Sequence, residues 1–365
     1  MGYIRRRINN IDISLKKYPA AENHGLVLSI IELAHRVKGI VAGNFDEGMK
    51  VTGTCAIDSY VENKVSFVKN GKYERFLAPL HNAIVLLPKN LAYCSEKYPR
   101  NTYIIVNNVD NAIIDLQDFF YISEFLITEK GISLTAKIHS TARIGKDVFI
   151  GENVYVGKNV VIGDTVKILH NSCIFDDVTI GNGTHIHTAV CLHRKCQIGN
   201  NCIIHSGVCV GDEGFRFEQD IEQKTVRKML NVGRVIIGDR VEIGANSTIE
   251  RATFSNDATI LFDDVKLDPL CHIGHNVKIG ARSIVAQSGI GGSTIVGEDV
   301  WIGTGVTISN NLNIGNRAKI LLNAVVAYDV SEGEMVSGFY AMPHKQWKRI
   351  YNRLKGENGN TIVSD

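Results

Sequence analysis

Residues 136–163 read AKIHSTARIGKDVFIGENVYVGKNVVIG, and a large aliphatic residue occupies every sixth position from Ile138 onward. The period continues without a miss to Val210. A helix repeats every 3.6 residues and a strand every two, so neither produces a sustained period of six. A parallel β-helix built from hexapeptides does. The aliphatic residues are Ile138, Ile144, Ile150, Val156, Ile162, Ile168, Ile174, Ile180, Ile186, Leu192, Ile198, Ile204 and Val210.

A second residue, usually small, stands two positions before each aliphatic one, as Val154 stands before Val156. The pattern predicts one short strand and one turn per hexapeptide, with both residues inside and three hexapeptides per triangular coil. Residues eighteen apart should then stack at the strand spacing of about 4.8 Å. Glycine often follows the aliphatic residue, as at Gly151 and Gly157. We expect it to supply turn conformations that other residues avoid.

The repeat is interrupted at three places. Residues 211–231 lack the pattern and must leave the coil as a loop, and a longer turn follows Ile249. A one-residue slip follows Ile279, which makes Ile284 the next inward residue. The predicted β-helix domain covers residues 131–326.

The flanking parts lack the period of six. Residues 1–130 mix helical and strand patterns, which predicts a small α/β domain, and residues 327–365 predict a C-terminal segment with one short basic helix. The fold class is therefore mainly β, with small helical parts at either side. The expected elements are helices at 29–37, 112–120 and 345–354, strands at 83–88 and 102–107, and a loop at 65–75.

Composition excludes several classes of protein. The 365 residues carry a formal net charge of +2 without a long run of like charges, so no nucleic-acid partner is indicated. No apolar run approaches the roughly 18 residues of a membrane span, and the basic start at residues 1–7 lacks the apolar segment of a signal peptide. We expect a cytoplasmic protein. Cys196, Cys202 and Cys271 fall on small inward positions and are expected in the core.

Eight of the twelve histidines lie in the repeat, where we expect most imidazole side chains to be exposed at a turn and to have no specific role. His187 and His205 are eighteen residues apart and could stack, but two ligands do not make a zinc site. We therefore expect no metal and no bound cofactor, although a metal-dependent hydratase remains an alternative. Flat coil faces suit packing against two further copies, so we expect a homotrimer with sites in the clefts between neighbours.

Residues 267–277 (LDPLCHIGHNV) suggest a general base. His275 is expected to face outward at a turn, and Asp268 could orient an imidazole from below or from a neighbouring chain. About one coil later, residues 288–293 contain three glycines, and a free N–H such as that of Gly292 could receive an oxyanion. A base beside an oxyanion donor is the arrangement of acyl transfer. Plain coil turns remain an alternative interpretation of the glycines.

Four motifs resemble the UDP-3-O-acylglucosamine N-acyltransferases of lipid A synthesis, which are left-handed β-helix homotrimers. The resemblance runs from about residue 25 to 350 and implies acyl transfer from a thioester to the amine of a nucleotide-linked sugar. The motifs are residues 66–73 (SFVKNGKY), 202–207 (CIIHSG), 233–246 (GRVIIGDRVEIGAN) and 275–280 (HNVKIG).

The resemblance also implies roles for single residues. His275 would be the base, Asp268 its partner and Gly292 the oxyanion donor. Phe67 and Tyr73 would bracket the nucleotide base, whereas spacing alone would place these two rings in a core. We further expect substrate contacts from His205, Phe215 and Asn276.

The chain departs from the family pattern near the expected acyl site. Pro269 replaces an asparagine beside the base, Asn311 stands where a histidine is expected, and residues 249–252 read IERA instead of IDRG. The C-terminal helix is short, which favours acyl-CoA over acyl carrier protein. We therefore predict an N-acyltransferase for a dTDP- or UDP-linked amino-dideoxyhexose of surface glycans. The alternatives are the lipid A enzyme using acyl carrier protein, and a non-catalytic trimer that binds sugar nucleotides.

Overall fold

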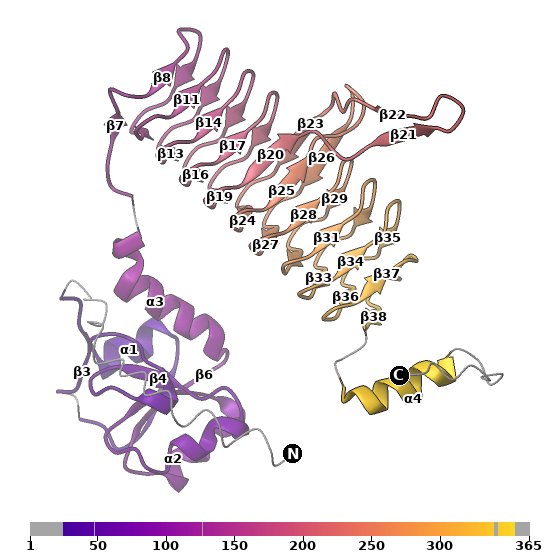
Figure 1. Cartoon of the computed structure of the whole chain (residues 1–365). Helices are drawn as coiled ribbons and strands as arrows, with labels where there is room; N and C mark the ends of the chain where they lie inside the picture. Colours follow the sequence, from indigo (N-terminus) through magenta and orange to yellow (C-terminus); the bar gives the residue numbers. More distant parts are fainter. Residues whose placement is uncertain (1–24, 47, 126, 339–341, 355–365) are drawn as a thin grey trace. The chain divides into compact units, whose positions relative to one another are not determined.

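The computed structural model describes residues 25–46, 48–125, 127–338 and 342–354. The chain forms two compact units, residues 1–127 and residues 128–365 (Figure 1). The basic start noted in the sequence lies outside the described residues. Within the described ranges, no helix has both the length and the apolar character needed to cross a membrane.

The N-terminal unit is built on a four-stranded sheet in the order β2-β6-β5-β4. β2 runs antiparallel to β6, and the other pairs are parallel. Ile84 and Leu86 join the apolar cluster that includes residues of α1 and α3, whereas Val85 and Leu87 join a second cluster. The apolar run of β5 is thus buried on both faces, as expected for a central strand. The elements are β1 (Leu28–Ser29), α1 (Ile30–Arg36), β2 (Ile40–Gly43), β3 (Lys50–Val51), η2 (Ile57–Ser59), β4 (Val65–Phe67), η3 (Gly71–Phe76), β5 (Ile84–Pro88), η4 (Lys89–Leu91), α2 (Cys94–Lys97), β6 (Thr102–Val106) and α3 (Val109–Phe125).

Most of these elements follow the sequence prediction. Ser29 caps α1 in a reciprocal capping box with Glu32, which fixes the start of the predicted helix. The two predicted strands are β5 and β6, and α3 extends beyond the predicted helix at both ends. The segment 65–75, predicted to be a loop, instead contains strand β4 and the start of 3₁₀ helix η3.

The second unit is a left-handed parallel β-helix whose three sheets contain eleven, ten and nine strands (Figure 1). Sheet 1 contains β7 (Gly131–Ile132), β10 (Phe149–Ile150), β13 (Lys167–Ile168), β16 (His185–Ile186), β19 (Ile203–Ile204), β24 (Glu242–Ile243), β27 (Lys266–Leu267), β30 (Ile284–Val285), β33 (Trp301–Ile302), β36 (Lys319–Ile320) and β38 (Met335–Val336). Sheet 2 contains β8 (Lys137–Ile138), β11 (Tyr155–Val156), β14 (Cys173–Ile174), β17 (Cys191–Leu192), β20 (Cys209–Asp212), β25 (Thr248–Glu250), β28 (His272–Ile273), β31 (Gly289–Ile290), β34 (Thr307–Ile308) and β37 (Val325–Val326). Sheet 3 contains β9 (Arg143–Ile144), β12 (Val161–Ile162), β15 (Thr179–Ile180), β18 (Gln197–Ile198), β23 (Arg234–Ile237), β26 (Ala258–Leu261), β29 (Lys278–Ile279), β32 (Ile295–Val296) and β35 (Asn313–Ile314).

The predicted inward pattern and register are confirmed. Ile150 pairs with Ile168, and Ile168 with Ile186, at the expected interval of eighteen residues. These three aliphatic residues are fully buried in one continuous core, and Cys196, Cys202 and Cys271 belong to the same core. The residues two positions before the three aliphatic ones, Val148, Val166 and Thr184, are also buried. We call the turns that follow the strands of sheets 1, 2 and 3 corner 1, corner 2 and corner 3.

Glycine after the aliphatic residue has a different role from the predicted one. Gly157 does not adopt a left-handed conformation, but a Cβ there would lie 2.4 Å from Asp176 Oδ1 and 2.8 Å from its backbone nitrogen. The glycine is needed because successive corners stack too closely for a side chain. The left-handed position comes two residues later, at Asn159 (φ 55°), where asparagine and aspartate are tolerated.

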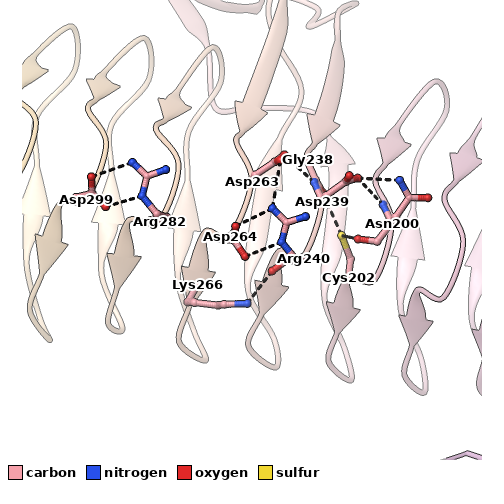
Figure 2. Close-up of polar contacts among 10 residues, drawn as sticks. All are labelled: Asn200, Cys202, Gly238, Asp239, Arg240, Asp263, Asp264, Lys266, Arg282 and Asp299. Carbon is pink, nitrogen blue, oxygen red and sulfur yellow. Dashed lines mark hydrogen bonds and ion pairs between the residues drawn. The ribbon is translucent and has the colours of Figure 1, made fainter. Parts of the chain in front are cut away.

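Side chains bridge successive coils along corner 3 (Figure 2). Asp239 Oδ1 accepts a hydrogen bond from the backbone N of Asn200 at 2.7 Å. Arg240 pairs with Asp264 on the next coil, and Arg282 with Asp299 (Figure 2). These ion pairs are solvent-exposed and add little stability individually, so the stacked backbone and the core carry the fold.

The interruptions of the repeat lie at the corners. Within residues 211–231, β21 (Phe217–Asp220) and β22 (Thr225–Lys228) form an antiparallel hairpin outside the coil. The slip falls one hexapeptide later than predicted, because Val285 is the buried residue and Ile284 is 39% exposed. The coil also continues past the predicted end, since β38 still pairs with β36. The C-terminal segment contains the predicted basic helix, α4 (His344–Leu354).

Candidate functional site

Corner 2 carries His275, which lies in the turn after β28. Its backbone N donates a hydrogen bond to Glu250 Oε2 at 2.9 Å. Its Nδ1 lies 3.1 Å from Asn276 Oδ1 and 3.4 Å from Thr253 Oγ1. Because an amide oxygen can only accept, this partner favours the tautomer with hydrogen on Nδ1. The Nε2 lone pair is then free to take a proton.

Gly292 lies directly against the His275 ring. A Cβ on Gly292 would lie 2.6 Å from His275 Nε2 and 2.7 Å from Cε1, so only glycine leaves the ring in place. Within the described ranges, the N–H of Gly292 donates no hydrogen bond. Gly292, whose N–H is unused, therefore lies against the ring nitrogen that can act as a base, and a base close to a free N–H suits acyl transfer.

Asn276 holds a neighbouring loop in place. Its Oδ1 accepts hydrogen bonds from Thr253 N and Oγ1, both at 3.0 Å, and its Nδ2 donates to Asp257 at 3.3 Å. The residue has φ 62°, a conformation that asparagine tolerates well. The geometry thus makes Asn276 a positioning residue for loop 251–257 beside His275, while direct substrate contact stays a prediction.

Glu250 is the main residue that sequence reasoning missed. Besides His275 N, its carboxylate accepts from Phe215 N at 3.3 Å and lies 3.6 Å from His272 Nε2. Asn231 lies close by, since a Cβ on Gly214 would touch both side chains. The Asn231 amide is buried and has no hydrogen-bond partner among the described residues, which marks a polar group available to a ligand.

Phe215 begins the hairpin loop and is 84% exposed, with its ring 4.9 Å from that of Phe217. The loop leaves the coil at corner 2, as does loop 251–257. Both insertions and His275 therefore belong to the same corner of successive coils, and Phe215 starts from the same corner as His275, while its contact with substrate stays a prediction.

Asp268 lies on a different corner from His275. It follows β27 on corner 1 and lines a groove of about 590 Å³ together with His205, Glu242 and Trp301. His205 Nε2 lies 2.9 Å from Glu242 Oε1. Asp268 and His275 form no hydrogen bond with each other in the described part of the chain. Within one chain, Asp268 and His275 are therefore separate, since Asp268 precedes β28 and His275 follows it.

The predicted nucleotide-binding aromatics belong to the N-terminal unit. Phe67 ends β4 and packs partly buried against the apolar cluster that includes residues of α1 and α3. Tyr73 is 40% exposed on η3 and stacks on Phe76 at 6.4 Å. Tyr73 is accessible to a ligand, and the bracketing of a nucleotide base by the two rings remains a prediction.

The fold and the repeats define a class, the hexapeptide-repeat proteins. A family model described as hexapeptide repeat of succinyl-transferase matches residues 234–253 and 272–310, and the GMPPB C-terminal domain model matches residues 132–221. The first match includes both His275 and Gly292.

Within this class, the resemblance to UDP-3-O-acylglucosamine N-acyltransferases is confirmed. The chain is 40% identical over 146 residues to UDP-3-O-acylglucosamine N-acyltransferase 2 of Sulfurimonas denitrificans, covering 40% of this chain and 45% of the relative. It is 34% identical over 154 residues to the probable mitochondrial UDP-3-O-acylglucosamine N-acyltransferase 2 of Arabidopsis thaliana, covering 42% and 50%. The chain spans about half the length of the curated relatives it matches. A solved UDP-N-acetylglucosamine acyltransferase of Francisella novicida is 23% identical, with a TM-score of 0.46 over 60% of this chain and 73% of that one.

Proposed function

We propose that this chain is an N-acyltransferase that moves an acyl group from a thioester to the amine of a UDP-linked 3-O-acylglucosamine. The observation that carries the proposal is the contact of His275 Nε2 with Gly292. The names of the relatives support this acceptor, which was the alternative in the sequence analysis, over a dTDP-linked amino-dideoxyhexose. The earlier preference for acyl-CoA has no support from these relatives.

The chemistry follows from the two groups. The acceptor amine attacks the thioester carbonyl, forming the C–N bond and an oxyanion. The N–H of Gly292 stabilises that oxyanion, and His275 Nε2 takes the proton lost by the amine. The C–S bond then breaks, and the proton passes to the leaving thiolate. A neutral imidazole is suited to this role because its unprotonated nitrogen can accept a proton.

A homotrimer would complete the site. Asp268 and His275 occupy different corners of the same coil, so a three-fold axis along the β-helix would bring corner 1 of one chain towards corner 2 of its neighbour at one height. Asp268 would then orient the neighbour's His275, and the groove beside Asp268 would take part of the acyl or sugar group. Phe67 and Tyr73 would bind the nucleotide.

The donor is proposed to be acyl carrier protein. Helix α4 contains Lys345, Lys348, Arg349 and Arg353 and no acidic residue, and Trp347 is 43% exposed on it. A basic helix with an exposed aromatic residue suits an acidic protein partner better than a small thioester.

The proposal is tested by incubating the protein with UDP-3-O-acylglucosamine and either acyl carrier protein thioesters or acyl-CoAs, with mass spectrometry of the products. Transfer from the carrier protein, lost in His275→Ala, is the expected result. A dTDP-linked amino sugar serves as the competing acceptor. Tight UDP binding without transfer to any amine would instead indicate a non-catalytic binding protein.

A further inference from the structure

A separate cluster of sulfur and nitrogen ligands lies on the outer side of sheet 2. Cys191 begins β17 and Cys209 begins β20, and the two residues pair in register on neighbouring strands. His193 follows β17, and its Nε2 lies 3.5 Å from Cys191 Sγ. The two sulfurs and a ring nitrogen of His193 all lie within 4.8 Å of one another. The cluster has no part in the acyl-transfer chemistry proposed for His275.

The spacing fits a zinc ion. Bonds of about 2.3 Å to sulfur and 2.0 Å to nitrogen place tetrahedral ligands of these two kinds roughly 3.5 Å apart. Two thiolates with one imidazole form a donor set that zinc prefers. Phe175 stacks on the His193 ring at 5.2 Å and fixes its orientation. Asp212 Oδ1 lies 3.9 Å from His193 Nε2, so a carboxylate is close to one of the three ligands.

The cluster is open to solvent. All three side chains are partly exposed, so an ion can enter from solvent. The spacing of histidines did not predict this cluster, because two of its three ligands are cysteines that lie eighteen residues apart on neighbouring strands.

We infer that Cys191, His193 and Cys209 bind one zinc ion, with Asp212 beside the fourth position. The loop 211–231 leaves the coil at Asp212, whose backbone O accepts a hydrogen bond from Arg251 N at 2.9 Å. A zinc ion there would hold the start of this loop, at Asp212, against the coil. The inference is independent of the proposed acyltransferase activity.

The test measures metal directly in the full chain under reducing conditions. The expected result is one zinc per chain by elemental analysis, and thiolate-to-cobalt charge-transfer absorption after replacement with Co²⁺. Binding displaces thiol protons, so cobalt uptake should weaken as pH falls. Removing zinc with a chelator should lower the melting temperature of the wild type.

Cys209→Ala and His193→Gln should abolish the charge-transfer absorption and the effect of the chelator on melting temperature. Cys173→Ala is the matched control, because Cys173 is the next cysteine of the same column, pairs with Cys191 and lies outside the cluster. Circular dichroism identifies any variant that fails to fold, and Cys191→Ala then replaces it. The inference is overturned if the reduced wild type takes up neither metal, if Cys209→Ala binds as well as Cys173→Ala, or if a Cys191–Cys209 disulfide persists under reductant.

Discussion

Adding one methyl group at Gly292 would test the proposed active site directly. The Cβ of Gly292→Ala would lie 2.6, 2.7 and 3.0 Å from three atoms of the His275 ring. The backbone at residue 292 does not have the positive φ that would itself oppose alanine. Substitution therefore leaves the coil intact, and the ring has to move by roughly 1 Å to reach ordinary van der Waals distance.

That displacement has a calculable effect on rate. A shift of about 1 Å in a catalytic group costs on the order of 10²-fold in rate. We therefore expect kcat of Gly292→Ala to fall about 100-fold, which corresponds to roughly 2.7 kcal/mol of transition-state stabilisation. KM for the acceptor should change little, because no substrate-contacting side chain is removed.

The assay is steady-state acyl transfer, with melting temperature measured in parallel. Gly289→Ala is the control on the same coil, since a Cβ there meets nothing within 4 Å and its backbone φ is not positive. It should retain wild-type kcat. Wild-type kcat in Gly292→Ala with a folded protein would refute the placement of Nε2 and the N–H, and an equal loss in both variants would indicate a general effect on the coil.

Three further predictions follow from the same geometry. Asn276→Gly keeps the positive φ but loses the hydrogen bonds to loop 251–257. The free energy of unfolding should therefore fall by roughly 1–3 kcal/mol, and hydrogen exchange in the loop should become faster. Unchanged exchange rates would count against the positioning role of Asn276. Asp268→Asn and His275→Ala should each be inactive when expressed alone. Co-expression of the two variants should restore roughly a quarter of wild-type activity, because about one neighbouring pair of chains in four combines an intact Asp268 with an intact His275. No recovery of activity would exclude a site shared between chains. Burial and the neighbouring His205 lower the pKa of His187, so the unfolded chain binds more protons than the folded chain. The stability of the folded chain should therefore decline as pH falls below about 6.5. Melting temperatures measured at several pH values should fall less steeply in His187→Asn than in the wild type.

The sequence predicts the coil well because a large aliphatic residue faces inward at every sixth position, and this spacing appears directly as the period of six. It does not locate the slip, because Ile284 and Val285 are both aliphatic and either could be buried. It also identifies His275 as an outward residue, since its place in the hexapeptide follows from Ile273. The contacts of Glu250 with His275 and Phe215 could not be predicted. They depend on loops that change the spacing between stacked residues to 24 and 39.

The sequence places Asp268 about one face before His275, because Asp268 follows the inward Leu267 and His275 follows the inward Ile273. It leaves open whether Asp268 orients the ring within one chain or from a neighbouring chain. The structure places them on successive corners, so only assembly can join them. The alignment of Cys173, Cys191 and Cys209 on neighbouring strands can be predicted from the sequence, since the three residues follow the eighteen-residue interval of the coil.

The loops at corner 2 have a consequence for how such a protein can change. After the insertions of 211–231 and 251–257 the chain continues into sheet 3 at β23 and β26, which stack on β18 and on each other, so the residues added outside do not interrupt the core. Each coil contacts only the coils above and below, which confines the effect of a longer or shorter loop to its own level. Substrate preference can therefore diverge by exchange of corner loops while the scaffold and its stability are inherited unchanged.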